Sequence, residues 1–428
     1  MSAEAAPRLT KTKRVSSVEF WRFLFTVLVA LYHFEIFFPK RMIFLSGSSA
    51  VEFFFVLAGF TLAMSAANRV ARGEERPTAK EAHRLALDYV KKKCKALWPI
   101  MVCWLILWTV LSVVNASGMS GMGDWMGMKM PTPLETGINT VMNSEWEMLF
   151  LVGTPFGFQG GFAPNVPLWF LTALIMMGYL YTYAINRHYD LTRFLAPVIG
   201  VGLYVFFALN TTSTLDHNIA LGHLNAGMVK AAAEMGFGIS LYLIYERMSA
   251  RKWGVGWKVL FQLIELYAIY RLFSLMIGQE LGFNNYRRIL YIMAILLFSF
   301  LNVTPLTHVL NNGFSRLLGK LTMPMYILHY NLISSYFGWI FAWKMELFKN
   351  IMDPNSRALY NFLDGLGGYD KAFKAKGSCG QKIHDFLQSS ILKRRQSYHR
   401  IGKLKTIIRK RKGKDCSNRK IIVILITR

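Results

Sequence analysis

Nine apolar runs of membrane-crossing length constrain the fold of this chain more than any other feature. A helix needs about 20 largely apolar residues to cross a bilayer. Of the 428 residues, 53% are hydrophobic and only 17% are charged. The runs cover residues 18–38, 50–67, 97–115, 166–185, 193–210, 228–246, 256–277, 286–303 and 321–343. The sequence therefore predicts an all-α fold, a polytopic transmembrane helix bundle with about nine to ten spans.

Basic residues between the runs predict which loops face the cytoplasm. Basic segments precede the first run and follow the second, fourth and sixth, whereas the intervening loops are rich in Gly, Ser, Thr and Asn. Because Lys and Arg accumulate in cytoplasmic loops, we expect a cytoplasmic N-terminus at residues 1–17 and a retained first span. The net charge of +26 then reflects topology, and we expect no nucleic-acid partner.

The end of the chain departs from this pattern. We assign residues 18–343 to the transmembrane domain and residues 344–428 to an atypical basic tail. Residues 371–428 carry 18 Lys and Arg against two Asp, and would lie outside after nine crossings unless a tenth crosses near residues 341–363. For the tail we favour disorder or an unrelated terminus over an arm that binds nucleic acid or anionic lipid. A short apolar stretch at residues 145–158 is expected at the membrane interface or as a re-entrant segment.

The cysteines predict neither a disulfide framework nor a metal site. The four cysteines lie far apart or on predicted spans, with no C-x-x-C pair and no metal-ligand spacing, at Cys94, Cys103, Cys379 and Cys416. We therefore expect no structural metal.

The first apolar run carries polar residues for which we expect either an interaction partner or a function, because placing a polar side chain in hydrocarbon costs free energy. Arg22 and His33 are separated by ten residues, which on a helix places them on one face, roughly 16 Å apart. The alternative is that Arg22 reaches the headgroups and His33 is a packing residue.

Glu52, at the start of the second run, offers a carboxylate partner for His33. A histidine beside a carboxylate can act as a general base, because the carboxylate fixes the tautomer of the imidazole and stabilises the imidazolium that forms when the histidine takes a proton. Glu35 competes for this partnership, but it lies two residues from His33 and so points about 200° away on a helix. We favour Glu52. The small residues Ala58 and Gly59 further along this run predict close helix contact.

A basic cluster precedes the third run, and two of its members, Lys92 and Lys95, lie one turn apart on a helix. The cluster is either a solvated, topology-setting charge run or an anion site for a phosphorylated cofactor. Lys230 and Glu234, also one turn apart, predict a local ion pair.

Five motifs occur in a fixed order: Arg22 followed ten residues later by His33, then VEFFFVLAGF, a basic cluster ending in LWP, NVPLWFLTAL, and LGKLTMPMYILHYNL. With these motifs, residues 16–343 resemble the integral-membrane acyltransferase type 3 family.

The resemblance implies a transmembrane helix bundle that moves an acyl group, most often acetyl from acetyl-CoA, to a hydroxyl of an envelope glycan or another extracytoplasmic acceptor. His33 matches the essential membrane histidine of the family, and Glu52 matches the acidic residue of its second motif. Arg22 matches the basic residue of the first motif, and Lys92 and Lys95 occupy the place of a cytoplasmic arginine pair. These three cations are the expected cofactor-binding residues.

Three further residues are expected to bind substrate. Tyr326 and His329 are retained from the last motif, and Trp169 lies beside a turn-rich external loop. His329 either lines the cavity or packs between helices. Trp169 either stacks on a sugar or anchors the helix in the interfacial aromatic belt. After Trp169 the chain lacks the carboxylate that many members of the family carry.

Two other functions compete with acyl transfer. A transporter or permease would use His33, Glu35 and Glu52 as a relay, although no inverted repeat is visible. A partner protein for a glycan polymerase would need no catalysis, and its intramembrane histidine should tolerate Gln. Whether an acyl group passes directly or through a histidine adduct stays open.

Overall fold

The computed structural model describes residues 15–35, 44, 46–126, 132–142, 166–210, 220–221, 224–277 and 286–352. The chain forms two compact units, Met1–Met345 and Glu346–Arg428. Of the second unit, only the helical residues as far as Met352 are described.

The described residues are almost entirely helical, which confirms the all-α polytopic bundle. In chain order the elements are α1 (Ser16–Glu35), η2 (Gly47–Ser49), α2 (Ala50–Ala71), α3 (Ala79–Met126), α4 (Pro133–Met142), η4 (Val166–Leu168), α6 (Trp169–Arg187), α7 (Tyr189–Asn210), β1 (Ala220–Leu221), β2 (Leu224–Asn225), α8 (Ala226–Ser249), α9 (Val255–Met276), α10 (Arg287–Leu301), α11 (Pro305–Leu310) and α12 (Gly313–Met352). The two short strands pair in an antiparallel hairpin. Each predicted apolar run coincides with a helix.

Six helices among the described residues are long and apolar enough to cross a membrane: α1, α2, α3, α7, α8 and α9. The full number of crossings stays a prediction. Helix α12 runs to Met352, and the rest of the predicted tenth crossing lies outside the described residues. The short apolar stretch at 145–158 and the basic tail at 371–428 also lie outside them.

Helix α3 joins the basic cluster and the third predicted span in one continuous element. It begins at a reciprocal cap: the amide of Thr78 donates to Glu81 Oε2 at 2.8 Å, and the amide of Glu81 donates to Thr78 Oγ1 at 3.3 Å. Such a capping box satisfies backbone donors that the first helical turn leaves free. The cap therefore fixes where the basic face of α3 starts.

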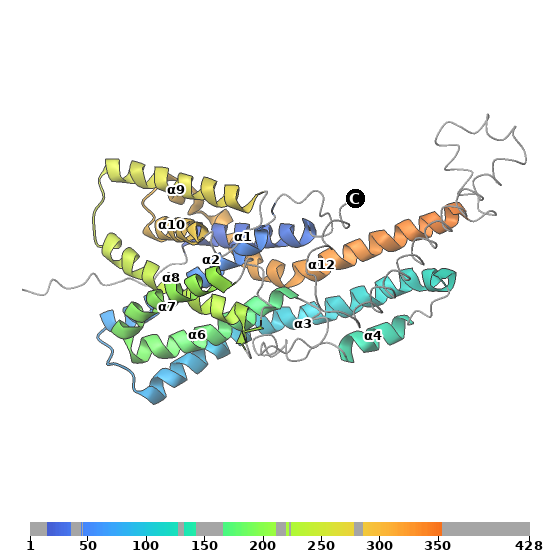
Figure 1. Ribbon diagram of the computed structural model, residues 1–428, viewed down its shortest axis with the longest axis horizontal. Coiled ribbons are helices and arrows are strands. Elements are labelled where there is room, and N and C mark those ends of the chain that lie inside the picture. The colour runs from blue at the N-terminus through green and yellow to red at the C-terminus, as the bar shows by residue number, and fades with distance from the viewer. Residues whose placement is uncertain are drawn as a thin grey trace, which may run out of the picture. The chain divides into compact units, whose positions relative to one another are not determined.

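Helices α2 and α8 form the most extensive contact among the described elements. Helix α8 also packs against α7, α6 and α10, and α2 packs against α1, α6 and α10. Helix α3 lies beside α6 and α4 (Figure 1). Elements far apart in sequence thus converge on the α2–α8 pair.

Glycines make the α2–α8 contact possible. A Cβ atom built on Gly59 would lie 1.9 Å from the carbonyl oxygen of Met235, and one on Gly238 would lie 2.1 Å from that of Val56. Both distances are far below a van der Waals contact, so the two backbones touch where the glycines lie. Small residues are the usual means of close helix approach in membranes, and the close contact predicted at Gly59 is confirmed.

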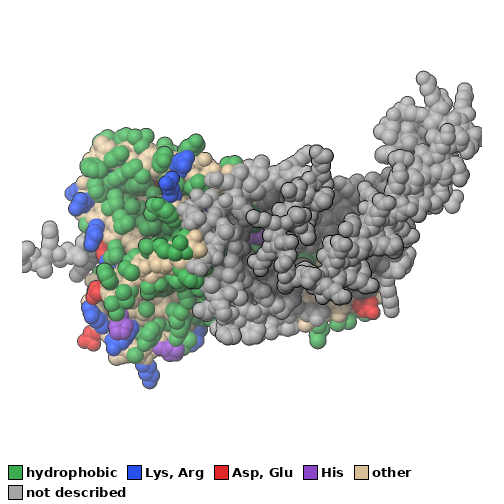
Figure 2. Space-filling model, viewed as in Figure 1, with side chains coloured by type: hydrophobic (Ala, Val, Ile, Leu, Met, Phe, Trp, Pro, Cys, Tyr) green, Lys and Arg blue, Asp and Glu red, His purple; other side chains and the backbone are tan. Residues whose placement is uncertain are grey.

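The surface of the described helices matches a hydrocarbon environment. Figure 2 shows apolar side chains over much of the visible face of these helices, with many charged side chains gathered toward one edge. Helix α7 shows the same property residue by residue, since Phe194, Val198 and Val205 are exposed on it. Exposed apolar residues in this number are expected where lipid replaces water around a helix.

Replacing Gly59 with Ala should lower the melting temperature, because the new methyl group meets backbone atoms of α8. Overpacking of this kind typically costs ~1–3 kcal/mol. Scanning fluorimetry of the detergent-purified protein would measure the change. Gly202→Ala in α7 is the matched control, because no atom lies within 4 Å of the added Cβ and Ala favours a helix over Gly. Equal melting of Gly59→Ala and wild type would contradict the backbone contact.

Candidate functional site

Two histidines from distant parts of the chain lie together in the bundle. The imidazole of His33, near the end of α1, lies with its ring centroid 5.2 Å from that of His329 on α12. The ring of Tyr330 meets His33 edge-on, also at 5.2 Å. His33 is half-buried, and His329 is only 5% exposed. The structure therefore brings together two of the predicted site residues.

The backbone of α12 fixes the proton position on neutral His329. Its Nδ1 lies 2.8 Å from the carbonyl oxygen of Tyr326. Because a carbonyl only accepts hydrogen bonds, Nδ1 carries the proton and Nε2 keeps a lone pair. This Nε2 is buried and has no hydrogen-bond partner among the described residues. His329 is therefore equipped to accept a proton at Nε2.

A cavity of about 400 Å³ lies toward the other end of α1. Its charged lining residues are Glu19 and Arg22 from α1 and Lys93 from α3. Arg22 Nη1 donates to Glu19 Oε2 at 2.6 Å, which leaves the three groups with one net positive charge. The remaining walls are largely apolar and come from α2, α6, α10 and α12. The cavity thus suits a ligand that combines an anionic group with an apolar arm.

The cation that α3 contributes to this cavity differs from the prediction. Lys92 and Lys95 are exposed, whereas Lys93 is half-buried, lines the cavity and holds its Nζ 5.5 Å from the ring centre of Tyr89. On a helix, adjacent residues differ in direction by about 100°. Lys93 therefore supplies the cation that α3 contributes to this cavity, and the role of Lys92 and Lys95 in binding a cofactor stays a prediction.

Aromatic side chains connect the cavity to the histidines. Phe54 and Phe170 line the cavity, and their ring centroids lie 6.4 and 5.4 Å from that of Tyr326. Tyr326 lies 5.8 Å from His329, and its hydroxyl donates to the carbonyl oxygen of Pro167 at 2.8 Å. Tyr326 is 3% exposed, and its ring is packed between the lining of the cavity and His329.

Glu52 lies in a buried cluster of charges at the start of α2. Its Oε2 accepts a hydrogen bond from Nε of Arg288 at 2.7 Å, and its Oε1 lies 2.9 Å from Nζ of Lys230. Lys230 also lies 3.8 Å from Glu234, whose Oε1 accepts a hydrogen bond from the hydroxyl of Tyr204 at 2.8 Å. All five side chains are buried. The cluster ties together α2, α7, α8 and α10.

This cluster changes the expected role of Glu52. We expected its carboxylate to support the imidazole of His33, but the structure commits both carboxylate oxygens to Arg288 and Lys230. The predicted ion pair between Lys230 and Glu234 is confirmed. The sequence analysis did not single out Arg288. A signal for it was present, because a carboxylate inside a membrane requires a cationic partner.

Trp169 is the remaining residue that we expected to bind substrate. Trp169 is half-buried at the first turn of α6, with its ring centroid 6.2 Å from that of Phe55. Its role in binding a sugar stays a prediction. Among the described residues, no group of three His, Cys, Asp or Glu side chains lies close enough together to hold a metal ion.

Comparison with known proteins adds one finding. A profile of the type 3 family, described as an acyltransferase domain, matches residues 15–360. This range includes the two histidines, the cavity and the charge cluster. No curated protein and no solved structure gives a significant match to the chain.

Replacing Glu52 with Ala should destabilise the protein strongly, because Arg288 and Lys230 would lose a buried counter-charge. Removing one partner of a buried ion pair typically costs ~3–5 kcal/mol. Thermal unfolding in detergent would measure the loss, and a second change, Arg288→Met, should recover part of it. Asp190→Ala is the control, since its pair with Arg76 is exposed and such pairs contribute little. A Glu52→Ala protein as stable as Asp190→Ala would contradict the cluster.

Proposed function

Because this chain belongs to the acyltransferase type 3 family, we propose that it is a membrane O-acyltransferase that moves acetyl, or another short acyl group, from acyl-CoA to a hydroxyl. The acceptor is a glycan or related molecule on the extracytoplasmic side of a bacterial inner membrane, and the N-terminus of the enzyme is cytoplasmic. The observation that carries this proposal is the paired arrangement along α1, with a cationic cavity near its start and the two histidines near its end.

The cavity fits an acyl-CoA donor by its chemistry. Arg22 and Lys93 supply positive charge for phosphate groups, and Arg is suited to phosphate by its planar set of donors. The apolar walls, which include Phe54, Leu57 and Leu174, suit the arm that ends in the thioester. When bound, acyl-CoA supplies an activated carbonyl carbon. The nucleotide portion would remain at the open end of the cavity.

The proposed reaction uses His33 as a general base. A nitrogen of its imidazole takes the proton of the acceptor hydroxyl while the hydroxyl oxygen attacks the thioester carbon. The carbon–sulfur bond then breaks, and the proton returns from the imidazolium to the leaving thiolate. In the alternative, a nitrogen of His33 attacks the thioester carbon, the carbon–sulfur bond breaks and the thiolate leaves. The acceptor oxygen then attacks the acyl carbon, the carbon–nitrogen bond to His33 breaks, and the proton of the acceptor hydroxyl passes to the thiolate.

His329 supports this role through its fixed tautomer. The lone pair on its Nε2 offers a nearby acceptor for a proton held by His33. Two imidazolium ions this close would repel each other in a site of low dielectric constant, so we propose that the pair takes up no more than one proton beyond those of the two neutral rings. Glu52 is a positioning residue in this scheme. It holds α2, whose side chains line the cavity.

Family membership favours acyl transfer over the transporter and over the partner protein without catalysis. The cationic cavity further supports an anionic donor, because a proton relay alone would not require Arg22 and Lys93 in one pocket. Incorporation of acyl label by isolated membranes would separate the three functions.

His33→Ala should abolish acyl transfer while leaving expression unchanged, because the base is lost and the fold is not. Loss of a general base typically lowers the rate by ~10²–10⁴. His329→Gln should lower kcat less and leave KM for the donor unchanged. The measurement is transfer of label from acetyl-CoA, radioactive in the acetyl group, into the glycan and lipid fractions of membranes.

His308→Ala is the matched control for these variants, because His308 is a histidine exposed on the short helix α11. Label incorporated equally by wild type and His33→Ala would refute the site. Absence of label from folded wild type, with native acceptors present, would refute acyl transfer from acetyl-CoA.

Lys93→Gln and Arg22→Gln should raise KM for acetyl-CoA, because each removes a charge from the cavity. Loss of a charge-assisted contact costs ~1.5–3 kcal/mol, which corresponds to roughly 10- to 150-fold in KM. Lys92→Gln and Lys95→Gln are the controls, since both side chains are exposed on the same helix. An equal rise of KM in all four variants would indicate general attraction by the basic face of α3 instead.

A further inference from the structure

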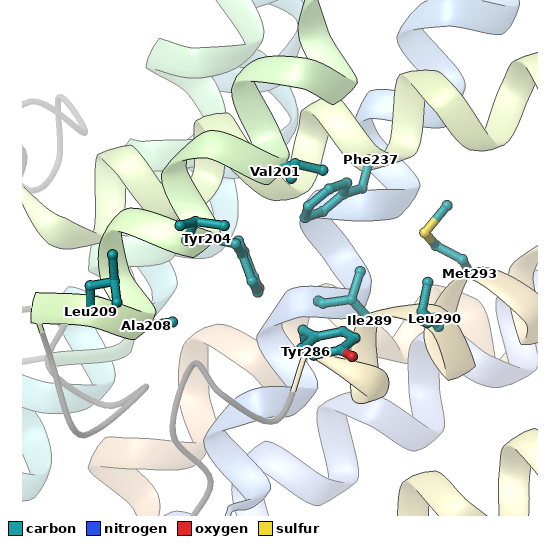
Figure 3. Close-up of a pocket in the computed structure, with 10 residues that line it drawn as sticks. Val201, Tyr204, Ala208, Leu209, Phe237, Tyr286, Ile289, Leu290 and Met293 are labelled. Atoms are coloured by element: carbon teal, nitrogen blue, oxygen red, sulfur yellow. The ribbon is translucent and has the colours of Figure 1, made fainter.

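A second cavity, of about 530 Å³, lies between α7 and α10 and is separate from the proposed acyl-transfer site. Both helices pack against α8, which provides its floor through Phe237. Figure 3 shows Tyr204 and Phe237 on one side of this groove, with Ile289 and Tyr286 across from them. The volume falls in the range of pockets that hold small organic molecules.

The lining of the groove is apolar apart from two tyrosine hydroxyls. One of them, on Tyr204, is already committed to a hydrogen bond with Glu234. The face of α7 in the groove repeats at helical spacing through Val201, Val205 and Leu209, all of which are exposed. Apolar cavities exclude water and accept apolar ligands. Because α7 is a candidate membrane span, the surrounding medium is hydrocarbon.

An exposed cation adjacent in the chain to a lining residue of the groove defines the rest of the ligand. Tyr286 lines the groove and is followed at once by Arg287, the first residue of α10. Arg287 is exposed and forms no ion pair with any described residue, whereas the next residue, Arg288, is buried against Glu52. Tyrosine and arginine at the end of a membrane helix lie at the level of lipid headgroups. The cation therefore complements a phosphate at that level.

From these observations we propose that the α7–α10 groove binds a bilayer phospholipid, with an acyl chain between the two helices and the headgroup phosphate at Arg287. The acyl chain of the lipid covers the wall formed by Tyr204. The charge cluster of Glu234, Lys230 and Glu52 is buried behind this wall. A bound lipid thus keeps water from a cluster that depends on burial for its strength.

The test uses the full chain in nanodiscs of phosphatidylcholine and phosphatidylglycerol, in which the phosphatidylglycerol carries a diazirine on its acyl chain. After irradiation, peptide mass spectrometry maps the labelled residues. We expect residues 201–209 and 289–293 to be labelled about tenfold more than the exposed Leu263 on α9, a preference of ~1.4 kcal/mol.

Ala208→Trp and Met293→Trp fill the groove from opposite helices and should each remove this excess label. Leu263→Trp is the matched control and should leave it unchanged. Arg287→Gln should weaken labelling by the phosphatidylglycerol probe and leave labelling by a diazirine-bearing diacylglycerol, which lacks phosphate, unaffected. If one Trp variant fails to fold, the other still tests the proposal, because its Trp fills the groove from a different helix.

Two results would overturn the proposal. Equal labelling of the groove and of Leu263 would make the groove an ordinary bilayer contact. Cross-links from the groove to a second copy of the protein would identify the groove as a protein interface, if Ala208→Trp removed both the cross-links and the dimer. Neither result bears on acyl transfer, so failure here and failure of the proposed function are distinguishable.

Discussion

The ionic contact between Glu52 and its two cations constrains the rest of the bundle. A carboxylate buried among membrane helices is tolerable only when it is paired and hydrogen-bonded. Glu52 meets that condition through Arg288 of α10 and Lys230 of α8. One residue thereby fixes α2 against two helices, while Gly59 lets α2 and α8 touch. Because α2 also supplies a wall of the cationic cavity, the geometry of the proposed donor site depends on a cluster that takes no part in the chemistry.

Much of the fold could be predicted from sequence, because hydropathy and charge act locally. Each apolar run overlaps a helix among the described residues, and Gly59 marked a close contact between α2 and α8. The details that the sequence could not supply depend on the rotation of each helix about its axis and on partners distant in the chain. Lys92 and Lys93 differ by about 100° around a helix, and only the packing of α3 decides which one faces the cavity. Likewise, Arg287 is exposed whereas its neighbour Arg288 is buried, a distinction that no local pattern encodes.

The site was predicted in part for the same reason. Arg22 and His33 share a helix face, so their relationship followed from the spacing alone. The partnership of His33 with His329 joins residues about three hundred positions apart in the chain. Sequence marked both histidines as candidates but offered no means to pair them. Glu52 was the favoured acidic candidate, but the structure pairs it with the two buried cations Arg288 and Lys230 instead.

The same geometry argues for the direction in which the reactants meet. The rings of Phe54, Phe170 and Tyr326 lie between the cationic cavity and the histidines. A sugar that moved past these rings would lose hydrogen bonds from several hydroxyls, each at a cost of roughly 1–3 kcal/mol. A thioester on a slender arm would lose far fewer. The aromatic wall therefore favours a donor that advances toward His33 over an acceptor that enters the cavity. An acceptor that reaches His33 from the opposite end of α1 never has to cross the wall.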